Sequence, residues 1–368
     1  SDDLSFEDDF ILMADTTDFL DFKLASKTAN VELIHYPGYL YLMSGLYRVS
    51  SWYGYHTLMP RFFNCMCLGW ISVIVRQLVL RYTAAESIAE HAALYIGCIP
   101  IMVYNASFIF RDTIVGFLVV LVTRLTLRAL ESNSGRIIQI GWFAIAILMA
   151  WTAGTFRSEI AYCLYAFIII CSGLLFYADE KRSRVPLLIF TFVAISAGIY
   201  LSSTDSSSSF TKLLRKWDGY TESRAMGEGV VTGLSAQIYQ IPFLPFGIVA
   251  RIMYGLISPI PLPIFDFDRI CISFGGMVNI LLLYLLWRGS KIIKGIRTIR
   301  PLLWVSAMVF MTFVFSGTSR HISTYYPLFT VIGAMGYANT PATFHKKAIY
   351  GGLAIFFFLA LIYLILKL

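Results

Sequence analysis

The chain alternates between long apolar runs and short polar connections along most of its 368 residues. Each run holds roughly 17 to 20 residues, which is the length that an α-helix needs to cross a hydrocarbon core of about 30 Å. The runs with this pattern are residues 61–80, 86–104, 113–130, 137–155, 158–177, 186–202, 270–288, 301–317, 324–340 and 348–366. The sequence therefore predicts an all-α, polytopic transmembrane helical protein with about ten spans.

The first part of the chain, residues 1–60, departs from this pattern. Acidic residues, among them Asp8 and Asp9, are interleaved there with Phe, Leu, Ile and Met. An apolar helix face opposite carboxylates is typical of a segment that lies on a membrane surface with its apolar side down. Residues 38–54 are aromatic but contain Arg48. They predict a second juxtamembrane helix, with a short or tilted span as the alternative.

A second polar region, residues 203–268, separates the sixth apolar run from the seventh. Its first half is rich in serine and charge, and its second half is apolar but interrupted by prolines. Because both ends of this region must lie on one face of the membrane, its apolar half is predicted to be re-entrant or interfacial. The chain thus divides into an outside acidic part (1–60), a first transmembrane bundle (61–202), an outside loop (203–268) and a second transmembrane bundle (269–368).

Composition and charge agree with this interpretation. Hydrophobic residues make up 58% of the chain and charged residues 14%, and the mean hydropathy of +0.70 is far above that of soluble domains. The net charge of +7 reflects Lys and Arg in alternate short connections, which the positive-inside rule places in the cytoplasm. We therefore expect a multi-pass plasma (inner) membrane protein with its acidic part outside, on the periplasmic face. We expect no nucleic acid as a partner, because the basic residues form no exposed patch.

Three arginines stand against this charge rule, because they lie in short connections on the outer side. They are Arg111, Arg157 and Arg320. A lipid phosphate or pyrophosphate at the outer interface would explain them, since a guanidinium binds phosphate oxygens in a bidentate manner. The alternative is that they pair with carboxylates such as Asp112 and Glu159, or extend to the lipid headgroups.

Acidic and imidazole side chains on the same face supply complementary chemistry. Transfer of a sugar from a phosphate needs a base for the incoming hydroxyl and positive charge near the leaving oxygens. Asp8, Asp9 and His321 are the candidate bases, with a solvated helix face as the alternative for either aspartate. Asp266 and Asp268 form a D-x-D that would suit a divalent cation, but a polar turn before the next span is the favoured explanation. We therefore expect no cofactor.

Residues in the front half of the chain, roughly 1–180, resemble a known family. After the acidic loop come Tyr36-Pro37-Gly38, then Arg61-x-x-Asn64 at the start of a span, Pro100 in the next span and Asp112 at the start of the third. In these features the chain resembles the C-type glycosyltransferases (GT-C fold), and most of all the branch with protein mannosyltransferases and lipid A aminoarabinose transferase. The resemblance implies a further transmembrane helix before the acidic loop and a polyprenyl-phosphate-linked sugar as donor. It also implies a catalytic acid in the first outside loop, while Asp112 matches the family's second-loop aspartate.

The back half resembles a different group. Its pattern consists of Arg111-Asp112, Arg157, and Arg320 followed by Tyr325, Tyr326 and Pro327. This is similar to O-antigen and exopolysaccharide polymerases, and it implies that polyprenyl-pyrophosphate-linked repeat units are joined on the outer face with arginines and no obligatory metal. Both resemblances imply glycosyl transfer from a lipid-linked donor to a saccharide or lipid acceptor. The expected partners are membrane lipids and envelope-polysaccharide assembly proteins.

From these features we expect direct displacement, in which Asp8, Asp9 or His321 takes the acceptor proton while Arg111, Arg157 and Arg320 hold the lipid phosphate. A transporter or a non-catalytic scaffold subunit for lipid-linked sugars is the alternative. A transporter is disfavoured because the sequence shows no internal repeat and its unusual charges gather at one face.

Overall fold

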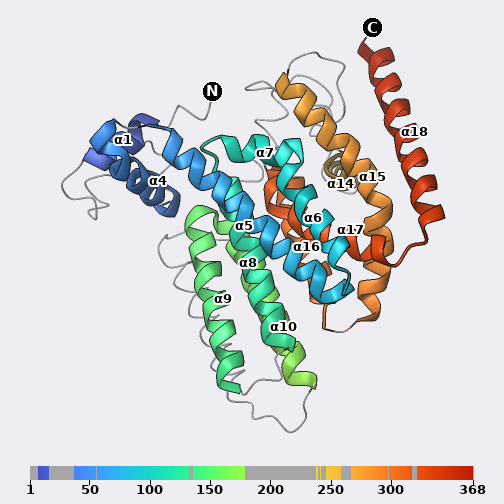
Figure 1. Ribbon diagram of the computed structural model, residues 1–368, viewed down its shortest axis with the longest axis horizontal. Helices are drawn as coiled ribbons and strands as arrows, with labels where there is room; N and C mark the ends of the chain where they lie inside the picture. Colours follow the sequence, from blue (N-terminus) through green and yellow to red (C-terminus); the bar gives the residue numbers. More distant parts are fainter. Residues whose placement is uncertain are drawn as a thin grey trace.

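The computed structural model of the chain is an all-α protein (Figure 1). It describes residues 7–15, 37–54, 56–131, 136–178, 238, 241, 246–257, 267–296, 298–316 and 321–367, with most of their side chains. Within these residues the protein has thirteen α-helices and one short 3-10 helix. The predicted all-α fold is confirmed.

The helices follow the apolar runs of the sequence. In chain order they are α1 (Glu7–Asp15), α4 (Pro37–Ser50), η1 (Ser51–Tyr53), α5 (Leu58–Thr83), α6 (Glu86–Cys98), α7 (Pro100–Ser107), α8 (Arg111–Glu131), α9 (Arg136–Phe156), α10 (Ser158–Ala178), α14 (Ile248–Ile257), α15 (Phe267–Gly295), α16 (Pro301–Ser316), α17 (Ile322–Ala338) and α18 (Ala342–Lys367). The predicted juxtamembrane helix corresponds to α4 and η1. The apolar run at 186–202 and most of the predicted loop at 203–268 lie outside the described residues, and α14 belongs to that loop.

Three helices, α5, α8 and α9, are each long and apolar enough to cross a membrane. Helices α6 and α7 pass this test only as a pair, and they are bent by 48° at the break between them. The break falls at Ile99 and Pro100, because a proline has no N–H for the helical ladder and suits the first position of α7. These apolar helices indicate a membrane protein, and among the described residues they provide three candidate spans, or four with the bent pair. The larger number of about ten stays a prediction.

Helix α17 lies at the centre of the bundle. All its residues from Ile322 to Gly336 except Phe329 are buried, and it packs against α5, α6, α8, α15 and α16. Glycines on the neighbouring helices permit this close contact. A Cβ atom at Gly116 of α8 would collide with the carbonyl oxygen of Ser323, and a Cβ atom at Gly289 of α15 would collide with that of Ile332. Close backbone approach at small residues is typical of helix packing in membranes.

Large apolar side chains cover the outward faces of the bundle. Trp151 and Ile137 are exposed on α9, and Phe357 and Leu361 are exposed on α18. Figure 1 shows α18 at one edge of the molecule, where it packs on α15. Soluble proteins rarely expose apolar faces of this extent, so these helices are suited to contact lipid.

The amphipathic helix predicted near the N-terminus is present as α1, but its apolar face packs on protein. Phe10 and Met13 are buried, and the ring centroid of Phe10 lies 5.4 Å from that of Tyr39 and 6.1 Å from that of Tyr47 on α4. The hydroxyl of Tyr47 also donates a hydrogen bond to Oε1 of Glu7 at 3.2 Å. The prediction that this face lies on the membrane surface is therefore wrong for α1, because the aromatic residues of α4 provide its apolar surface.

Candidate functional site

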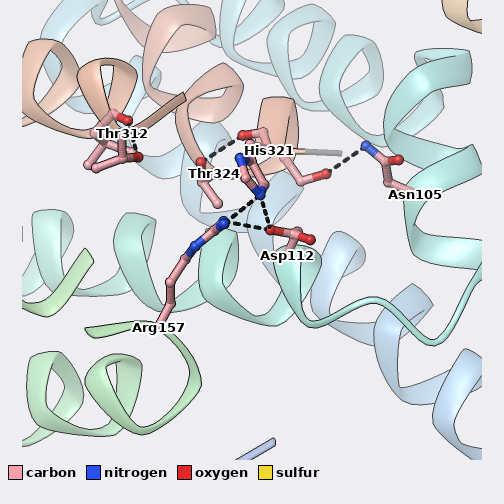
Figure 2. A network of polar contacts seen from close by, with 8 residues as sticks. Asn105, Asp112, Arg157, Thr312, His321 and Thr324 are labelled. Atoms are coloured by element: carbon pink, nitrogen blue, oxygen red, sulfur yellow. Dashed lines mark hydrogen bonds and ion pairs between the residues drawn. The ribbon is translucent and has the colours of Figure 1, made fainter. Parts of the chain in front are cut away.

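Three ionisable residues from distant parts of the sequence meet at one end of the bundle. Asp112 lies in the first turn of α8, Arg157 connects α9 to α10, and His321 immediately precedes α17. Each of them is therefore at a helix end, where the chain passes between helices. Figure 2 shows the side chain of Arg157 reaching from the connection between α9 and α10 to Asp112 and His321. We call these residues the Asp112–Arg157–His321 cluster.

Arg157 holds the cluster together. Its Nη1 donates a hydrogen bond to Oδ1 of Asp112 at 2.9 Å, and its Nη2 lies 2.5 Å from Nε2 of His321. The same imidazole nitrogen is 3.6 Å from Oδ1 of Asp112, which is too far for a hydrogen bond. Because a guanidinium only donates hydrogen bonds, Nε2 of His321 is the acceptor.

The cluster is almost closed to solvent. The exposed fraction is 3% for Asp112, 7% for Arg157 and 4% for His321. Burial of a charge is costly unless the charge is paired, and here the carboxylate of Asp112 and the guanidinium of Arg157 compensate each other. The pairing that the sequence left open for Arg157 is therefore confirmed, since its partner is Asp112.

The connection between α7 and α8, which leads into Asp112, is held by side chains of α5 and α4. Asn64 of α5 is fully buried, and its Nδ2 donates to the carbonyl oxygens of Phe108 at 2.6 Å and Phe110 at 3.0 Å. The hydroxyl of Tyr39, on α4, donates to the carbonyl oxygen of Ile109. Buried backbone carbonyl groups in a connection between helices need hydrogen-bond partners of this kind. These bonds hold the backbone that leads into α8.

Helix α4 also contacts the corner that carries Arg157. A Cβ atom at Gly38 would collide with the side chain of Thr155 and would lie 3.2 Å from the ring of Phe156. Gly38 is the second residue of α4, so the missing side chain lets this helix begin directly against the end of α9. Pro37 and Gly38, which belong to the Tyr-Pro-Gly motif of the sequence, thus lie beside the connection that carries Arg157.

The start of α17, which places His321, is held by polar contacts and by close packing. Oγ1 of Thr324 donates to the carbonyl oxygen of His321 at 2.7 Å. Asn105 of α7 donates from Nδ2 to Oγ of Ser323 at 3.0 Å (Figure 2). Since Gly116 brings the backbone of α8 against Ser323, both α7 and α8 contact this first turn.

The structure gathers part of the predicted site. It brings together Asp112, Arg157 and His321, although the first is separated from the second by 45 positions and the second from the third by 164. Arg111 is half-buried and precedes Asp112 in the first turn of α8. These four residues all lie at the same end of the bundle.

The other candidates lie apart from the cluster or outside the described residues. Asp8 is exposed on α1, which packs on α4, and it makes no hydrogen bond or ion pair with another described residue. The side chain of Asp9 and all of Arg320 are outside the described residues. The same holds for Asp266 and for the side chain of Asp268, so the D-x-D pattern stays a prediction.

Three residues that support the cluster were not predicted as site residues. Asn105 carries the clearest signal, because an amide inside an apolar run must find a hydrogen-bond partner when it is buried. Ser323 and Tyr39 carry no comparable signal, since hydroxyl side chains occur throughout this sequence. Asn64 is part of the predicted Arg-x-x-Asn motif, and the structure explains its position through its bonds to the α7–α8 connection.

The cluster combines a proton acceptor with fixed positive charge. A carboxylate accepts several hydrogen bonds, and a guanidinium has five N–H donors, so neither group is saturated by one contact between them. In the part of the chain that the structure describes, no group of three or more His, Cys, Asp or Glu is placed to hold a metal ion. The chemistry that the cluster offers is therefore proton transfer and stabilisation of negative charge.

Comparisons with protein-family models, with curated proteins and with solved structures find no match. The class that the fold defines is an all-α membrane protein with a buried Asp–Arg–His cluster at one end of its bundle. A function for the protein therefore has to follow from the chemistry of this cluster and from its place among the helices.

Proposed function

We propose that the protein is an integral-membrane glycosyltransferase that moves a sugar, or a sugar repeat unit, from a polyprenyl-phosphate-linked donor to a saccharide or lipid acceptor. The main supporting observation is that Asp112, Arg157 and His321 are buried together where the helices of an apolar bundle end. Transfer from a lipid phosphate needs a proton acceptor and fixed positive charge near the headgroup level. The cluster offers both, and the exposed apolar helix faces suit a polyprenyl tail.

In the proposed reaction the acceptor hydroxyl attacks the anomeric carbon, and the bond from that carbon to the phosphate oxygen breaks. The Asp112 carboxylate takes the hydroxyl proton. The leaving phosphate keeps the electrons of the broken bond, and the charge that develops on it is stabilised by Arg157. His321 accepts a hydrogen bond from Arg157 and so orients the guanidinium, which makes it a positioning residue in place of a base. Arg111 and Arg320, the sequence neighbours of Asp112 and His321, are further candidates for phosphate contacts.

We place this reaction on the outer face of the membrane. Helix α8 begins with Asp112 in its first turn and carries Arg128 in its last turn, so the cluster and the basic residues lie at opposite ends of it. Arg81 lies in the last turn of α5, which packs against α8. The positive-inside rule would put the basic end in the cytoplasm and the cluster at the periplasmic side.

A specific observation favours a pyrophosphate-linked donor. The residues in the cluster belong to the pattern that resembles O-antigen and exopolysaccharide polymerases, since it includes Asp112, Arg157 and the neighbour of Arg320. The C-type glycosyltransferase resemblance implies instead a base in the acidic loop, where Asp8 is exposed on α1 and apart from the cluster. Asp112 belongs to both resemblances, so it is the position of Asp8 away from the cluster that supports polymerisation of repeat units over transfer of a single sugar.

A transfer assay on the full-length protein in lipid nanodiscs tests the proposal. It compares a polyprenyl-monophosphate sugar with a polyprenyl-pyrophosphate oligosaccharide as donors. Asp112→Asn keeps an oxygen that accepts from Arg157 but removes the base, so we expect turnover to fall by about a hundredfold or more. Asp8→Asn is the matched control, with turnover close to that of the unchanged protein. Arg320→Ala tests one of the two further candidates for phosphate contacts, and we expect it to slow chain growth.

Two results would change this view. Loss of monophosphate turnover in Asp8→Asn, with turnover kept in Asp112→Asn, would place the base in the acidic loop and support a single-sugar transferase. No turnover with either donor, in a protein that still binds the lipid, would contradict both enzymatic proposals. A transporter or scaffold subunit for lipid-linked sugars would then be the better explanation.

A further inference from the structure

A second group of arginines lies at the other end of the bundle. Arg124 and Arg128 are one turn apart on α8, and Arg81 lies in the last turn of α5, which packs against α8. Arg124 is close enough to experience repulsion from both Arg128 and Arg81. It is also twelve positions after Asp112, which corresponds to about 18 Å along the helix axis. Two helices thus bring three positive charges together, well away from the Asp112–Arg157–His321 cluster.

Arg124 is the central member of this group. It is half-buried, and among the described residues it has no hydrogen-bond or ion-pair partner. The guanidinium carbon of Arg128 lies 4.5 Å from the ring centroid of Trp142 on α9. Arginine and tryptophan both favour the level of the lipid headgroups, where one end of the side chain is apolar and the other is wet. Adjacent like charges repel each other, and an anion placed among them would remove this cost.

An apolar surface continues from the arginines along α9. Ile138 and Ile145 are exposed, and they lie one turn before and one turn after Trp142 on the same face of the helix. A lipid with its phosphate at the arginines would therefore have an apolar surface for its chain. This juxtaposition of positive charge with an apolar stripe distinguishes the site from arginines that only face water.

We propose that Arg81, Arg124 and Arg128 bind the phosphate of a lipid headgroup at the end of the bundle opposite the cluster. A guanidinium pairs with phosphate oxygens through two parallel hydrogen bonds, and Arg124 is the member without a protein partner among the described residues. The phosphate belongs either to an anionic phospholipid of the bilayer or to a polyprenyl phosphate. The proposal does not depend on the glycosyltransferase activity proposed above, because it uses none of the same residues.

The chain offers a matched control in Arg76, which lies five positions before Arg81 on α5. Its Nη2 is 3.0 Å from Oε1 of Glu86 and 3.8 Å from Oε1 of Glu90. The charge of Arg76 is thus already compensated by protein carboxylates. Arg76→Gln removes the same charge as Arg124→Gln without removing a proposed phosphate ligand.

Native mass spectrometry of the full-length protein, released from nanodiscs, measures the lipid that stays bound. The nanodiscs contain phosphatidylcholine alone, or with phosphatidylglycerol, or with polyprenyl monophosphate. We expect a one-to-one adduct in the second or third case and its loss by about tenfold in Arg124→Gln. Arg76→Gln should retain the adduct. Arg124→Lys keeps the charge without the planar fork, so it should lose only a few-fold and also serves if Arg124→Gln fails to fold.

The outcomes separate the two sources of phosphate. An Arg124-dependent adduct with phosphatidylglycerol alone identifies a bilayer lipid, and one with polyprenyl monophosphate alone identifies the carrier. Adducts with both indicate a site that recognises the shared phosphate. The proposal is overturned if the unchanged protein retains neither lipid, if Arg124→Gln retains the adduct, or if Arg76→Gln and Arg124→Gln lose it equally.

Discussion

At the scale of single residues, the candidate site depends on Arg157, because this side chain contacts both Asp112 and His321 while those two are 3.6 Å apart. Arg157→Ala would leave the Asp112 carboxylate buried without its cation. We expect the free energy of unfolding to fall by about 3 to 5 kcal/mol, as measured by thermal or denaturant unfolding in detergent. Arg76→Ala breaks an exposed ion pair and should cost less than about 1 kcal/mol.

The double variant Arg157→Ala/Asp112→Ala shows whether the predicted loss of stability comes from the ion pair between these two residues. Removal of both charges leaves no unpaired carboxylate, so the double variant should be more stable than the sum of the two single losses predicts. Strict additivity would show that the two residues are not energetically coupled, and it would contradict the contact seen here.

The second prediction at the residue scale concerns Asn64. Its amide nitrogen donates hydrogen bonds to the carbonyl oxygens of Phe108 and Phe110, which precede Asp112. In Asn64→Asp a carboxylate would replace the amide and would only repel those oxygens. We expect a loss of about 1 to 3 kcal/mol in stability and a loss of the proposed transfer activity, measured in the nanodisc assay. Asn339→Asp is the control, since Asn339 bonds one carbonyl, that of Met335, at the other end of α17. Unchanged activity in Asn64→Asp would show that this connection does not position Asp112.

The cluster residues could be predicted individually but not as a group. Asp112, Arg157 and His321 stand out because an ionisable residue at the end of an apolar run is costly and calls for a partner. Their meeting could not be predicted, because run lengths do not determine which helices are neighbours. For Arg157 the sequence allowed both a phosphate and a carboxylate as partner, and only the packing of α8 beside the α9–α10 corner shows the carboxylate.

At the scale of elements, the bounds of the helices could be predicted from the sequence, while their bends and their packing partners could not. The apolar runs predict α5, α8 and α9 well, since the length of a run determines where a spanning helix can begin and end. The bend at Pro100 was not predicted, because a proline in a membrane helix can either kink it or be accommodated. The partner of α1 was not predicted either, since an apolar face fits a membrane surface and the aromatic side of α4 equally well.

The close approach of α8 to α17 gives a prediction at this scale. In Gly116→Ala the new methyl group would collide with the carbonyl oxygen of Ser323, two residues after His321. The start of α17 would have to move away from α8, so His321 would lose its contact with Arg157. We expect a lower unfolding temperature and a loss of transfer activity, although alanine is the better helix former by up to about 1 kcal/mol.

Gly141→Ala on α9 is the matched control for this change. A Cβ atom at Gly141 meets nothing within 4 Å, so only the helix propensity changes there. This variant should be as stable as the unchanged protein, or slightly more stable. If Gly116→Ala behaves in the same way as Gly141→Ala, then the contact between α8 and α17 does not determine the geometry of the cluster.

At the scale of the whole molecule, the two ends of the bundle differ in chemistry. One end holds a buried cluster whose charges compensate each other, and the other holds the arginines Arg81, Arg124 and Arg128. This polarity was predictable from alternate connections in the sequence, because it depends only on which residues end each helix. Helix α5 connects the two ends of the bundle. It has 26 residues and is about 39 Å long, which is longer than a hydrocarbon core of about 30 Å.

The orientation of the molecule can be tested at the two ends of α5. Ser51 precedes this helix and Ser87 follows it, and both are exposed. In a background with Cys65→Ser and Cys98→Ser, a membrane-impermeant maleimide should label Ser51→Cys in intact cells and Ser87→Cys only after permeabilisation. The physical reason is that Arg81 and the α8 arginines favour the cytoplasm, which leaves the opposite end outside. The reverse pattern would put the cluster in the cytoplasm and exclude a periplasmic donor, and labelling of both positions from outside would show that α5 does not cross the membrane.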